Sequence, residues 1–396
     1  MLTLLVISIF INYIDRSNLS IAAPIIQGEL GLSPVQVGSL FSAFFWTYAL
    51  VQLFGIAGWL ADRFPAGLVL AAGYLLWSGA TVVTGLVSGF TALFLARLVL
   101  GAGESVAYPC YSRILAADLP EHRRGLANAL IDAGSKLGPA LGSYIGAMLV
   151  TSIGWRAFFI GLGAGSLVWL LPWFRWMPRS HAVTARARSV GPSVWQIAQR
   201  RSAWGTFLGH FCGNYFWFFL LTWLPTYLVK ERGLSMTRMG QISTLAYLAI
   251  ATATICAGWL SDRWIAAGAS PTRVRKTVIV TGLTLATSIM PVAVIADMRA
   301  SITLLFVSCM SFGVYVSNHW ATTQTLSGPL AAGRWTSLQN GIGNLSGIAA
   351  SWLTGFVVQE TGSFHLAFVV AGAVALTGAM MWGLVVGRVE PVRWDE

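Results

Sequence analysis

Long apolar stretches alternate with short polar or basic segments along the whole chain. These stretches reach the roughly 20 residues that a helix needs to cross a hydrocarbon core. Backbone groups in lipid must hydrogen-bond within their own segment, which favours helices, and no run of about ten alternating residues predicts a barrel strand. The pattern predicts an all-α polytopic membrane protein with twelve spans, at residues 2–26, 35–58, 67–88, 91–115, 125–150, 156–177, 204–229, 237–260, 276–297, 301–326, 337–359 and 365–387.

A seven-residue phrase occurs twice in this pattern. It reads GWLADRF from Gly58 and GWLSDRW from Gly258, and each copy closes an apolar run. A shorter echo at Gly31 and Gly233 keeps nearly the same spacing. The repeat predicts two pseudo-symmetric six-helix halves, the construction of many secondary transporters. We expect an N-terminal bundle at 1–178, a cytoplasmic linker at 179–202, and a C-terminal bundle with a short cytoplasmic tail at 203–396.

Composition and charge fit a membrane protein. The chain is 56% hydrophobic and 10% charged, whereas soluble domains carry about 25% charged residues. Its net charge of +11 lies in short loops rather than on one face, which argues against a nucleic-acid partner. Lys and Arg concentrate in alternate loops and in the linker, so both termini are predicted to be cytoplasmic. We expect the protein to lie in a bacterial inner membrane. Because the chain begins inside its first span, we expect a cytoplasmic leader or an earlier start codon upstream.

Charged residues inside the predicted spans are the strongest functional signal, since ionisable groups in lipid are costly unless they are paired or functional. Asp15 and Arg16 lie about 20 Å along the first span at 1.5 Å per residue. Arg97 and Glu104 are seven residues apart in the fourth span and share one face. Two acids and two arginines on two helices predict a set that exchanges partners. The alternative is a static ion-pair cluster, although such clusters are often no more stabilising than apolar packing.

The chemistry of this set favours an anionic substrate coupled to protons. A guanidinium offers a planar, two-pronged match to a carboxylate. A carboxyl group buried away from water readily takes up a proton, and a protonated Asp15 or Glu104 would release an arginine for the substrate. Lys136, in the fifth span, adds positive charge. Tyr13, Tyr48 and Asn340 are further polar candidates, as are Ser317, His319 and Trp320 in one helical turn, although aromatic residues in spans also serve as anchors or packing.

Several of these motifs resemble known families. The phrase at Gly58, Asp62 and Arg63, with its copy at Gly258, Asp262 and Arg263, resembles the loop signature of the major facilitator superfamily and implies a gating role. The segments Asn12–Ser20 and Ala96–Pro109 resemble the motifs of spans one and four in the anion:cation symporter family. That resemblance implies that Asp15 and Glu104 carry the coupling protons and that Arg16 and Arg97 bind or gate the carboxylate. It also implies sugar-acid contacts from Tyr13, Tyr48, Ser317, Trp320 and Asn340.

Two positions depart from the sugar-acid pattern of that family. Lys136, with Ser135 beside it, stands where a neutral polar residue such as glutamine is expected nearby, and His319 replaces a smaller polar residue. We therefore include these three residues among the candidate substrate contacts.

The sequence thus predicts a transporter and not an enzyme, because it holds no metal-ligand spacing, nucleophile–base pair or glycine-rich phosphate loop. The expected activity is proton-coupled symport of a small organic anion, such as a hexonate or hexuronate, by alternating access. A proton-independent facilitator and an efflux antiporter remain alternatives. Expected partners are the organic anion, protons and the lipid bilayer. We expect no nucleic acid, no metal, no cofactor besides the coupling proton, and a monomer.

Overall fold

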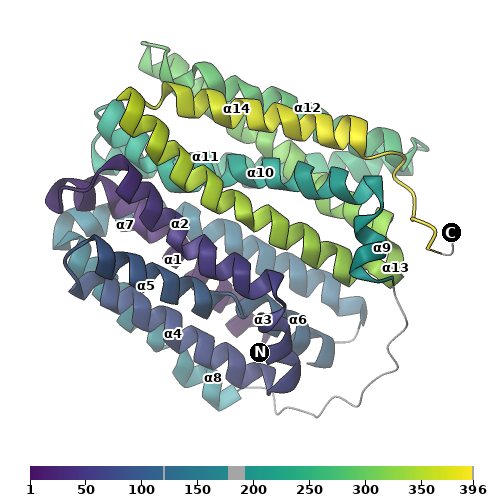
Figure 1. Ribbon diagram of the computed structural model, residues 1–396, viewed down its shortest axis with the longest axis horizontal. Helices are drawn as coiled ribbons and strands as arrows, with labels where there is room; N and C mark the ends of the chain where they lie inside the picture. The colour runs from purple at the N-terminus through teal and green to yellow at the C-terminus, as the bar shows by residue number, and fades with distance from the viewer. Residues whose placement is uncertain (119–120, 177–191, 395–396) are drawn as a thin grey trace. The chain divides into compact units, whose positions relative to one another are not determined.

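The computed structural model describes residues 1–118, 121–176 and 192–394 (Figure 1), without the side chains at 62, 116–129, 132, 329, 330, 332 and 333. Every regular element in these ranges is helical, which confirms the all-α expectation. The helices are α1 (Leu2–Glu29), α2 (Pro34–Leu53), α3 (Ile56–Arg63), α4 (Ala66–Leu86), α5 (Phe90–Glu104), α6 (Ala107–Asp118), α7 (Glu121–Leu167), α8 (Leu170–Trp176), α9 (Val194–Ala198), α10 (Arg201–Thr226), η1 (Tyr227–Glu231), α11 (Met236–Ala266), α12 (Pro271–Ala286), η2 (Thr287–Ala293), α13 (Met298–Thr361), α14 (His365–Met380) and η3 (Met381–Val385).

The predicted spans all have helical counterparts within the described ranges. Ten helical segments there are long and apolar enough to cross a membrane, and one of them extends over Ala133–Trp176. That segment turns at Gly154, whose φ of 80° interrupts the helical conformation, and α10 supplies a further long helix. Gly328 divides α13 in the same way, at a φ of 60°. Glycine occupies these kinks because it adopts positive φ without steric cost.

Some predicted spans contain breaks that the apolar pattern did not reveal. Gly55, with a φ of 69°, separates α2 from α3. A second break at Ser105–Val106 separates α5 from α6, immediately after Glu104. The repeated phrase is also helical rather than a loop: its first copy forms most of α3 and its second lies near the end of α11. The expectation of a loop at Gly58–Arg63 and Gly258–Arg263 is therefore wrong, and the turns follow each copy.

The chain divides into two compact units. Unit 1 comprises Met1–Thr184, Leu221–Thr244 and Ser351–Gln359, and unit 2 comprises Ala185–Leu220, Leu245–Ala350 and Glu360–Glu396. Unit 1 thus contains the first run of helices together with short pieces from later in the chain. The expected boundary at the 179–202 linker stays a prediction.

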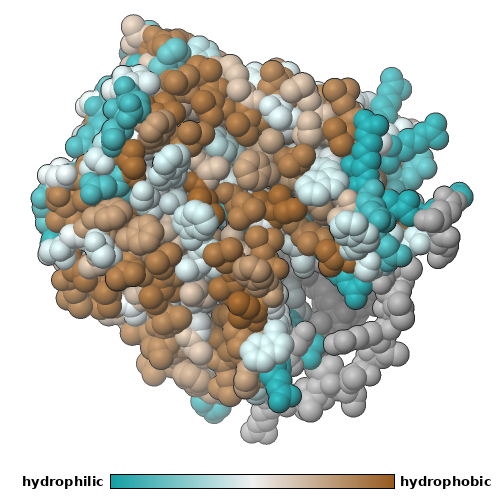
Figure 2. Space-filling model, in the orientation of Figure 1, coloured by the Kyte–Doolittle hydropathy of each residue, from teal (hydrophilic) through white to brown (hydrophobic). Residues whose placement is uncertain are grey.

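Large apolar side chains cover much of the outer surface of the helices (Figure 2). Leu171, Ile255 and Leu384 are each more than 70% exposed. Such a surface is suited to lipid, because exposed apolar patches of this kind are rare on soluble monomers. Many serine, threonine and asparagine side chains are buried, and so are four of the described charged ones: Asp15, Arg16, Arg97 and Glu104.

Candidate functional site

Glycines bring the helices of unit 1 close enough for polar side chains to meet. A Cβ on Gly138 of α7 would lie 2.7 Å from the Phe10 carbonyl oxygen of α1. On α5, a Cβ on Gly101 would overlap the Phe44 carbonyl oxygen of α2. Close backbone contact through glycine is typical of packed membrane helices. The fifth predicted span therefore packs closely on the first, and the fourth packs closely on the second.

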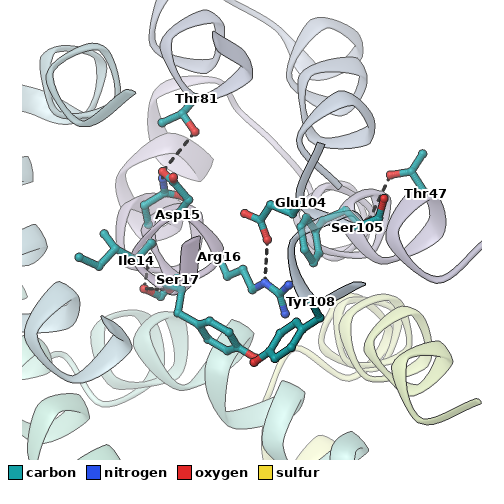
Figure 3. A network of polar contacts seen from close by, with 12 residues as sticks. Ile14, Asp15, Arg16, Ser17, Thr47, Thr81, Glu104, Ser105 and Tyr108 are labelled. Carbon is teal, nitrogen blue, oxygen red and sulfur yellow. Dashed lines mark hydrogen bonds and ion pairs between the residues drawn. The ribbon is translucent and has the colours of Figure 1, made fainter. Parts of the chain in front are cut away.

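An ion pair between α1 and α5 forms the centre of this site. Arg16 Nε donates to Glu104 Oε2 at 2.7 Å, with the two side chains 5% and 0% exposed (Figure 3). The contact uses one guanidinium nitrogen and one carboxylate oxygen. Arg16 Nη2 and Glu104 Oε1 are buried with no hydrogen-bond partner among the described residues. The pair is therefore only partly satisfied, unlike a bidentate arginine–carboxylate pair.

Asp15 points away from Arg16, toward α4 (Figure 3). Its Oδ1 accepts from Thr81 Oγ1 at 3.2 Å and from Asn18 Nδ2 at 3.3 Å, while Oδ2 is buried with no partner in the described part of the chain. This divergence follows from helix geometry, since neighbouring residues point about 100° apart. The site therefore has two carboxyl groups in separate surroundings: Asp15 beside neutral donors and Glu104 beside a cation.

Aromatic rings surround the Arg16 guanidinium. Its Cζ lies 4.6 Å from the centre of the Tyr13 ring, 4.5 Å from that of Tyr48 and 5.1 Å from that of Phe44. Cation–π contacts of this kind gain strength where water is excluded. They stabilise the charged side chain, and its Nη2 stays without a hydrogen-bond partner among the described residues. Tyr13 and Tyr48, both predicted site residues, therefore contact the central arginine.

Arg97 contributes a second guanidinium from α5. It is 3% exposed, and its Cζ lies 5.3 Å from the centre of the Phe44 ring. Its Nε and Nη1 are buried with no hydrogen-bond partner among the described residues. Glu104, which shares a helix with Arg97, pairs with Arg16 instead, and Arg97 keeps donors to offer.

Two predicted residues of the fifth span lie on α7. Ser135 is buried and Lys136 is half-buried, and Lys136 Nζ donates to Ser135 Oγ at 3.2 Å.

The predicted residues of the later helices belong to unit 2. His319 and Trp320 lie together on α13, with ring centres 4.9 Å apart. Ser317 instead lies beside the repeated phrase: a Cβ on Gly258 would be 3.8 Å from the Ser317 Cβ. The neighbouring Asn318 donates to Ser261 Oγ of that phrase at 2.8 Å. Asn340 is half-buried, and its carbonyl accepts from Asn344.

The charged residues of the repeated phrase are only partly described. The Asp62 side chain lies outside the described residues. Arg63 is exposed near the end of α3, and Arg263 Cζ lies 4.0 Å from the centre of the Trp259 ring near the end of α11. Asp262 is also exposed on α11. These positions place the described cations in the last turn of a helix, where positive charge is favourable.

Sequence reasoning missed several residues of these polar groups. Thr81, Asn18 and Phe44 complete the surroundings of Asp15 and Arg16, and His210 of α10 stacks on His319. Each polar residue among these lies inside an apolar span, and that position was the only sequence signal that could have indicated it. Their partners on other helices could not be read from one chain.

Comparisons with known proteins agree with this architecture. Residues 5–351 match the family model described as Major Facilitator Superfamily. A probable sulfoacetate transporter of Cupriavidus necator is 33% identical over 94% of this chain and 90% of its own. A D-galactonate transporter of Escherichia coli O6:H1 is 30% identical over 99% and 96%. A probable galactarate/D-glucarate transporter of Bacillus subtilis is 30% identical over 96% and 90%.

Solved structures show the same fold. A bacterial homologue of the human lysosomal transporter Spinster, in an inward-facing and occupied conformation, aligns with a TM-score of 0.82 over 97% of this chain and 96% of its own, at 17% identity. The family match and the transporter relatives confirm the prediction of a transporter rather than an enzyme. The chain belongs to the major facilitator superfamily of membrane transporters.

Proposed function

We propose that this protein is a proton-coupled symporter of small organic anions, above all sugar acids such as hexonates and hexuronates, and that it works by alternating access. The observation that carries the proposal is the buried, half-satisfied Arg16–Glu104 pair, with Arg97 and Asp15 beside it. A fully satisfied pair would favour a structural role, whereas this one leaves donors and a carboxylate oxygen for exchange.

In the proposed cycle, protonation of Glu104 removes its negative charge and weakens its hold on Arg16. The guanidinium then takes the substrate carboxylate in a two-pronged contact, for which its geometry is suited. Arg97 supplies further donors, and Asp15 carries a second coupling proton. Coupling arises because an unpaired charge is costly in a buried site, so the site occludes only when Arg16 is paired, with Glu104 when the site is empty or with the substrate carboxylate when it is loaded.

The relatives support an organic anion as the substrate class. Their names specify sulfoacetate, D-galactonate and galactarate/D-glucarate, and all of these are acids with further oxygen atoms. Tyr13, Tyr48, Lys136, Ser135, Ser317, His319, Trp320 and Asn340 are the proposed substrate contacts beyond the arginines. In this proposal, Gly58, Asp62 and Arg63, with Gly258, Asp262 and Arg263, gate access.

Two other modes of transport compete with symport. A facilitator would still take up its substrate when the proton gradient collapses. An efflux antiporter would export its substrate in exchange for protons that enter. The second arginine counts against an antiporter for apolar compounds, because two buried guanidinium groups favour an anion.

The setting of the protein is part of the proposal. We place it in a bacterial inner membrane, with both termini in the cytoplasm and two six-helix halves at 1–178 and 203–396 joined by the 179–202 linker. It would work as a monomer, with the proton as its coupling ion and without another cofactor.

Uptake into proteoliposomes tests this function. Hexonates, hexuronates, aromatic acids and dicarboxylates are offered with and without an inward proton gradient. Accumulation of a sugar acid that depends on the gradient is expected. Uptake of neutral sugars or cations, with sugar acids inert, would contradict the proposal.

A further inference from the structure

One face of α1 carries four buried polar side chains, and two of them, Ser8 and Asn12, have no part in the mechanism above. Ser8, Asn12, Asp15 and Asn18 follow one another at intervals of four, three and three residues, so they share a face of the helix. Each of the four is 0% exposed. At 1.5 Å per residue they extend over about 15 Å of the helix. We call these four residues the α1 polar stripe.

Hydrogen bonds from the chain satisfy the α1 polar stripe only in part. Ser8 Oγ pairs with the Tyr111 hydroxyl of α6 at 2.7 Å, and Asn18 Nδ2 donates to Asp15 Oδ1 at 3.3 Å. Asn12 Oδ1 and Nδ2, Asp15 Oδ2 and Asn18 Oδ1 are buried without a hydrogen-bond partner among the described residues. Each such atom costs about 1–3 kcal/mol, so a ligand that bonds to them is favoured.

The turn of α4 before Thr81 has unpartnered polar atoms too. Thr81 donates to Asp15 Oδ1 at 3.2 Å, and Trp77 and Ser78 lie one turn before it. Both are 0% exposed, and Trp77 Nε1 and Ser78 Oγ have no hydrogen-bond partner in the described structure. A Cβ on Gly103, the residue before Glu104, would lie 3.2 Å from the Trp77 Cβ. Trp77 is thus a neighbour of both carboxyl-bearing regions.

The mixture of donors and acceptors identifies water as the ligand. Asn12 Nδ2 and Trp77 Nε1 only donate, whereas the free oxygen atoms of Asp15 and Asn18 accept. A metal cation would satisfy the oxygen atoms and be repelled by the N–H groups, and an anion would do the reverse. Water both donates and accepts, and a buried water makes about three hydrogen bonds to polar groups of this kind.

Asn12 links the surroundings of the two carboxyl groups. It lies one turn before both Asp15 and Arg16, and it lies beside Glu104 without a hydrogen bond of normal geometry. The charged groups in electrostatic range of Asp15 are Glu104 and Arg97. Asp15 points toward Thr81, whereas Glu104 pairs with Arg16 (Figure 3). Because the two carboxyl groups have different partners, a proton that passes between them needs a carrier, and a water bonded to Asn12 is placed to be one.

We propose that the α1 polar stripe holds buried water molecules, and that these waters pass protons between Asp15 and Glu104, with Asn12 as the residue that positions them. In this step a proton leaves Asp15 while Glu104 takes one up from the water, so the negative charge moves from Glu104 to Asp15 and nothing else is consumed. Thr81 and Asn18 donate to the resulting Asp15 carboxylate, and protonated Glu104 releases Arg16. The inference rests on the proposed function, in which both carboxyl groups carry coupling protons.

Radiolytic hydroxyl-radical labelling of the purified full-length protein, read by mass spectrometry, tests for the water. The radicals form from bound water, so a buried ring beside water is oxidised and a dry ring is not. Trp77 and Trp173 are a matched pair, because both are 0% exposed in unit 1, whereas Trp173 Nε1 donates to the Gly67 carbonyl at 3.0 Å. We expect Trp77 to be labelled at least about three times faster than Trp173, and Asn12→Leu to remove that difference, because it takes away the polar groups that hold the water.

Two results of the labelling would overturn the inference. One is equal labelling of Trp77 and Trp173 in the wild type. The other is protection of Trp77 by sodium chloride but not by choline chloride, which would indicate a cation site instead of water.

Uptake into proteoliposomes tests the relay. In Asn12→Leu, uptake of D-galactonate driven by a proton gradient should fall at least about tenfold, while counterflow exchange stays within about twofold of the wild type, because proton transfer needs groups within reach of one water. Asn12→Ser should restore most of the driven uptake, since a hydroxyl still holds water. Ser20→Ala is the control, because this buried hydroxyl donates within α1 to the Ser17 carbonyl at 2.8 Å.

A purely structural role for Asn12 would reduce driven uptake and counterflow together, and that result would contradict the relay. If Asn12→Leu does not fold, Ser78→Ala replaces it as a smaller change at another unpartnered group. The same selective loss of driven uptake is then expected, and an equal loss of counterflow would count against the relay.

The two readouts separate this inference from the proposed function. If wild-type uptake ignores the proton gradient, the proposed function and the relay are both contradicted, and the labelling still shows whether the stripe holds water. If wild-type uptake depends on the gradient but Asn12→Leu retains it, the relay alone is contradicted.

Discussion

The buried polar groups of the two units differ in chemical kind. In unit 1, α1 and α5 bring two carboxyl groups and two guanidinium groups among aromatic rings, with one partly satisfied ion pair. In unit 2, α10 and α13 bring together imidazole, amide and indole groups, and the described acidic residues lie near helix ends. Carboxyl groups that gain and lose a proton are suited to proton coupling. Neutral hydrogen-bond donors with fixed geometry are suited to discrimination between solutes. The two copies of the repeated phrase thus lie in two units whose buried polar groups have different proposed roles.

The largest expected effect is the loss of transport when the central cation is removed. Arg16→Ala leaves Glu104 buried without its partner, and breaking a buried pair costs about 3–5 kcal/mol. We expect uptake to fall by at least about a hundredfold, at 1.36 kcal/mol per factor of ten. Arg16→Lys should restore little, because an ammonium group lacks the two-pronged geometry. Radiolabelled uptake measures both, with the exposed Arg299→Ala as the control; wild-type rates in Arg16→Ala would contradict the assignment.

Glu104→Gln is expected to separate coupling from exchange. The amide keeps the shape of the side chain but cannot take up and release a proton. Accumulation driven by a proton gradient should therefore be abolished, while counterflow between labelled and unlabelled substrate continues at a measurable rate. Gradient-driven accumulation that survives in Glu104→Gln would favour the facilitator alternative or assign coupling to Asp15 alone.

Thr81→Val is expected to have a moderate effect. The change removes the hydroxyl that donates to Asp15 Oδ1 at 3.2 Å and leaves Asn18 as its remaining described partner. A hydrogen bond to a charged group contributes about 1.5–3 kcal/mol, so we expect transport to fall by roughly tenfold. Thr84→Val is the matched control, because the Thr84 hydroxyl donates to its own helix at Ala80. Equal losses in the two variants would indicate a helix effect rather than a role for Asp15.

The smallest expected effect is on stability and tests the packing that positions α1. In Gly138→Ala the new Cβ would meet the Phe10 carbonyl oxygen at 2.7 Å and the Tyr13 Cβ at 2.9 Å. Overpacking of this kind costs about 1–3 kcal/mol, so the melting temperature should fall. Gly142→Ala, four residues further along α7, meets its nearest atom at an ordinary 3.4 Å and should be tolerated. A similar melting temperature for both variants would contradict close α1–α7 packing as the determinant.

Most of the fold could be predicted from the sequence because apolar length dictates membrane helices. The twelve predicted spans have counterparts, even where α7 and α13 each run through two of them across a glycine kink. The break after Glu104 was not predicted, since it lies inside an uninterrupted apolar run. The repeated phrase was expected as a loop because it carries charges, yet charges at a helix end leave a helix intact.

The sequence predicted which charged residues form the candidate site, but not which way their side chains point. Charges inside apolar runs identified Asp15, Arg16, Arg97 and Glu104. Which arginine pairs with Glu104 depends on the rotation of α1 against α5, and a single sequence does not specify that rotation. Thr81 lies inside an apolar span, but the sequence does not show that it contacts Asp15, and the apolar Phe44 carried no signal of its own. His210 is separated from His319 by more than a hundred residues.

The most direct measurement of proton coupling is the proton flux that accompanies substrate. Proteoliposomes are loaded with a pH-sensitive dye, and a sugar acid such as D-galactonate is added outside with no imposed proton gradient. We predict that the lumen of wild-type vesicles acidifies as substrate enters, and that vesicles with Glu104→Gln show no acidification. Substrate entry without any change of lumenal pH in the wild type would contradict the proposed symport.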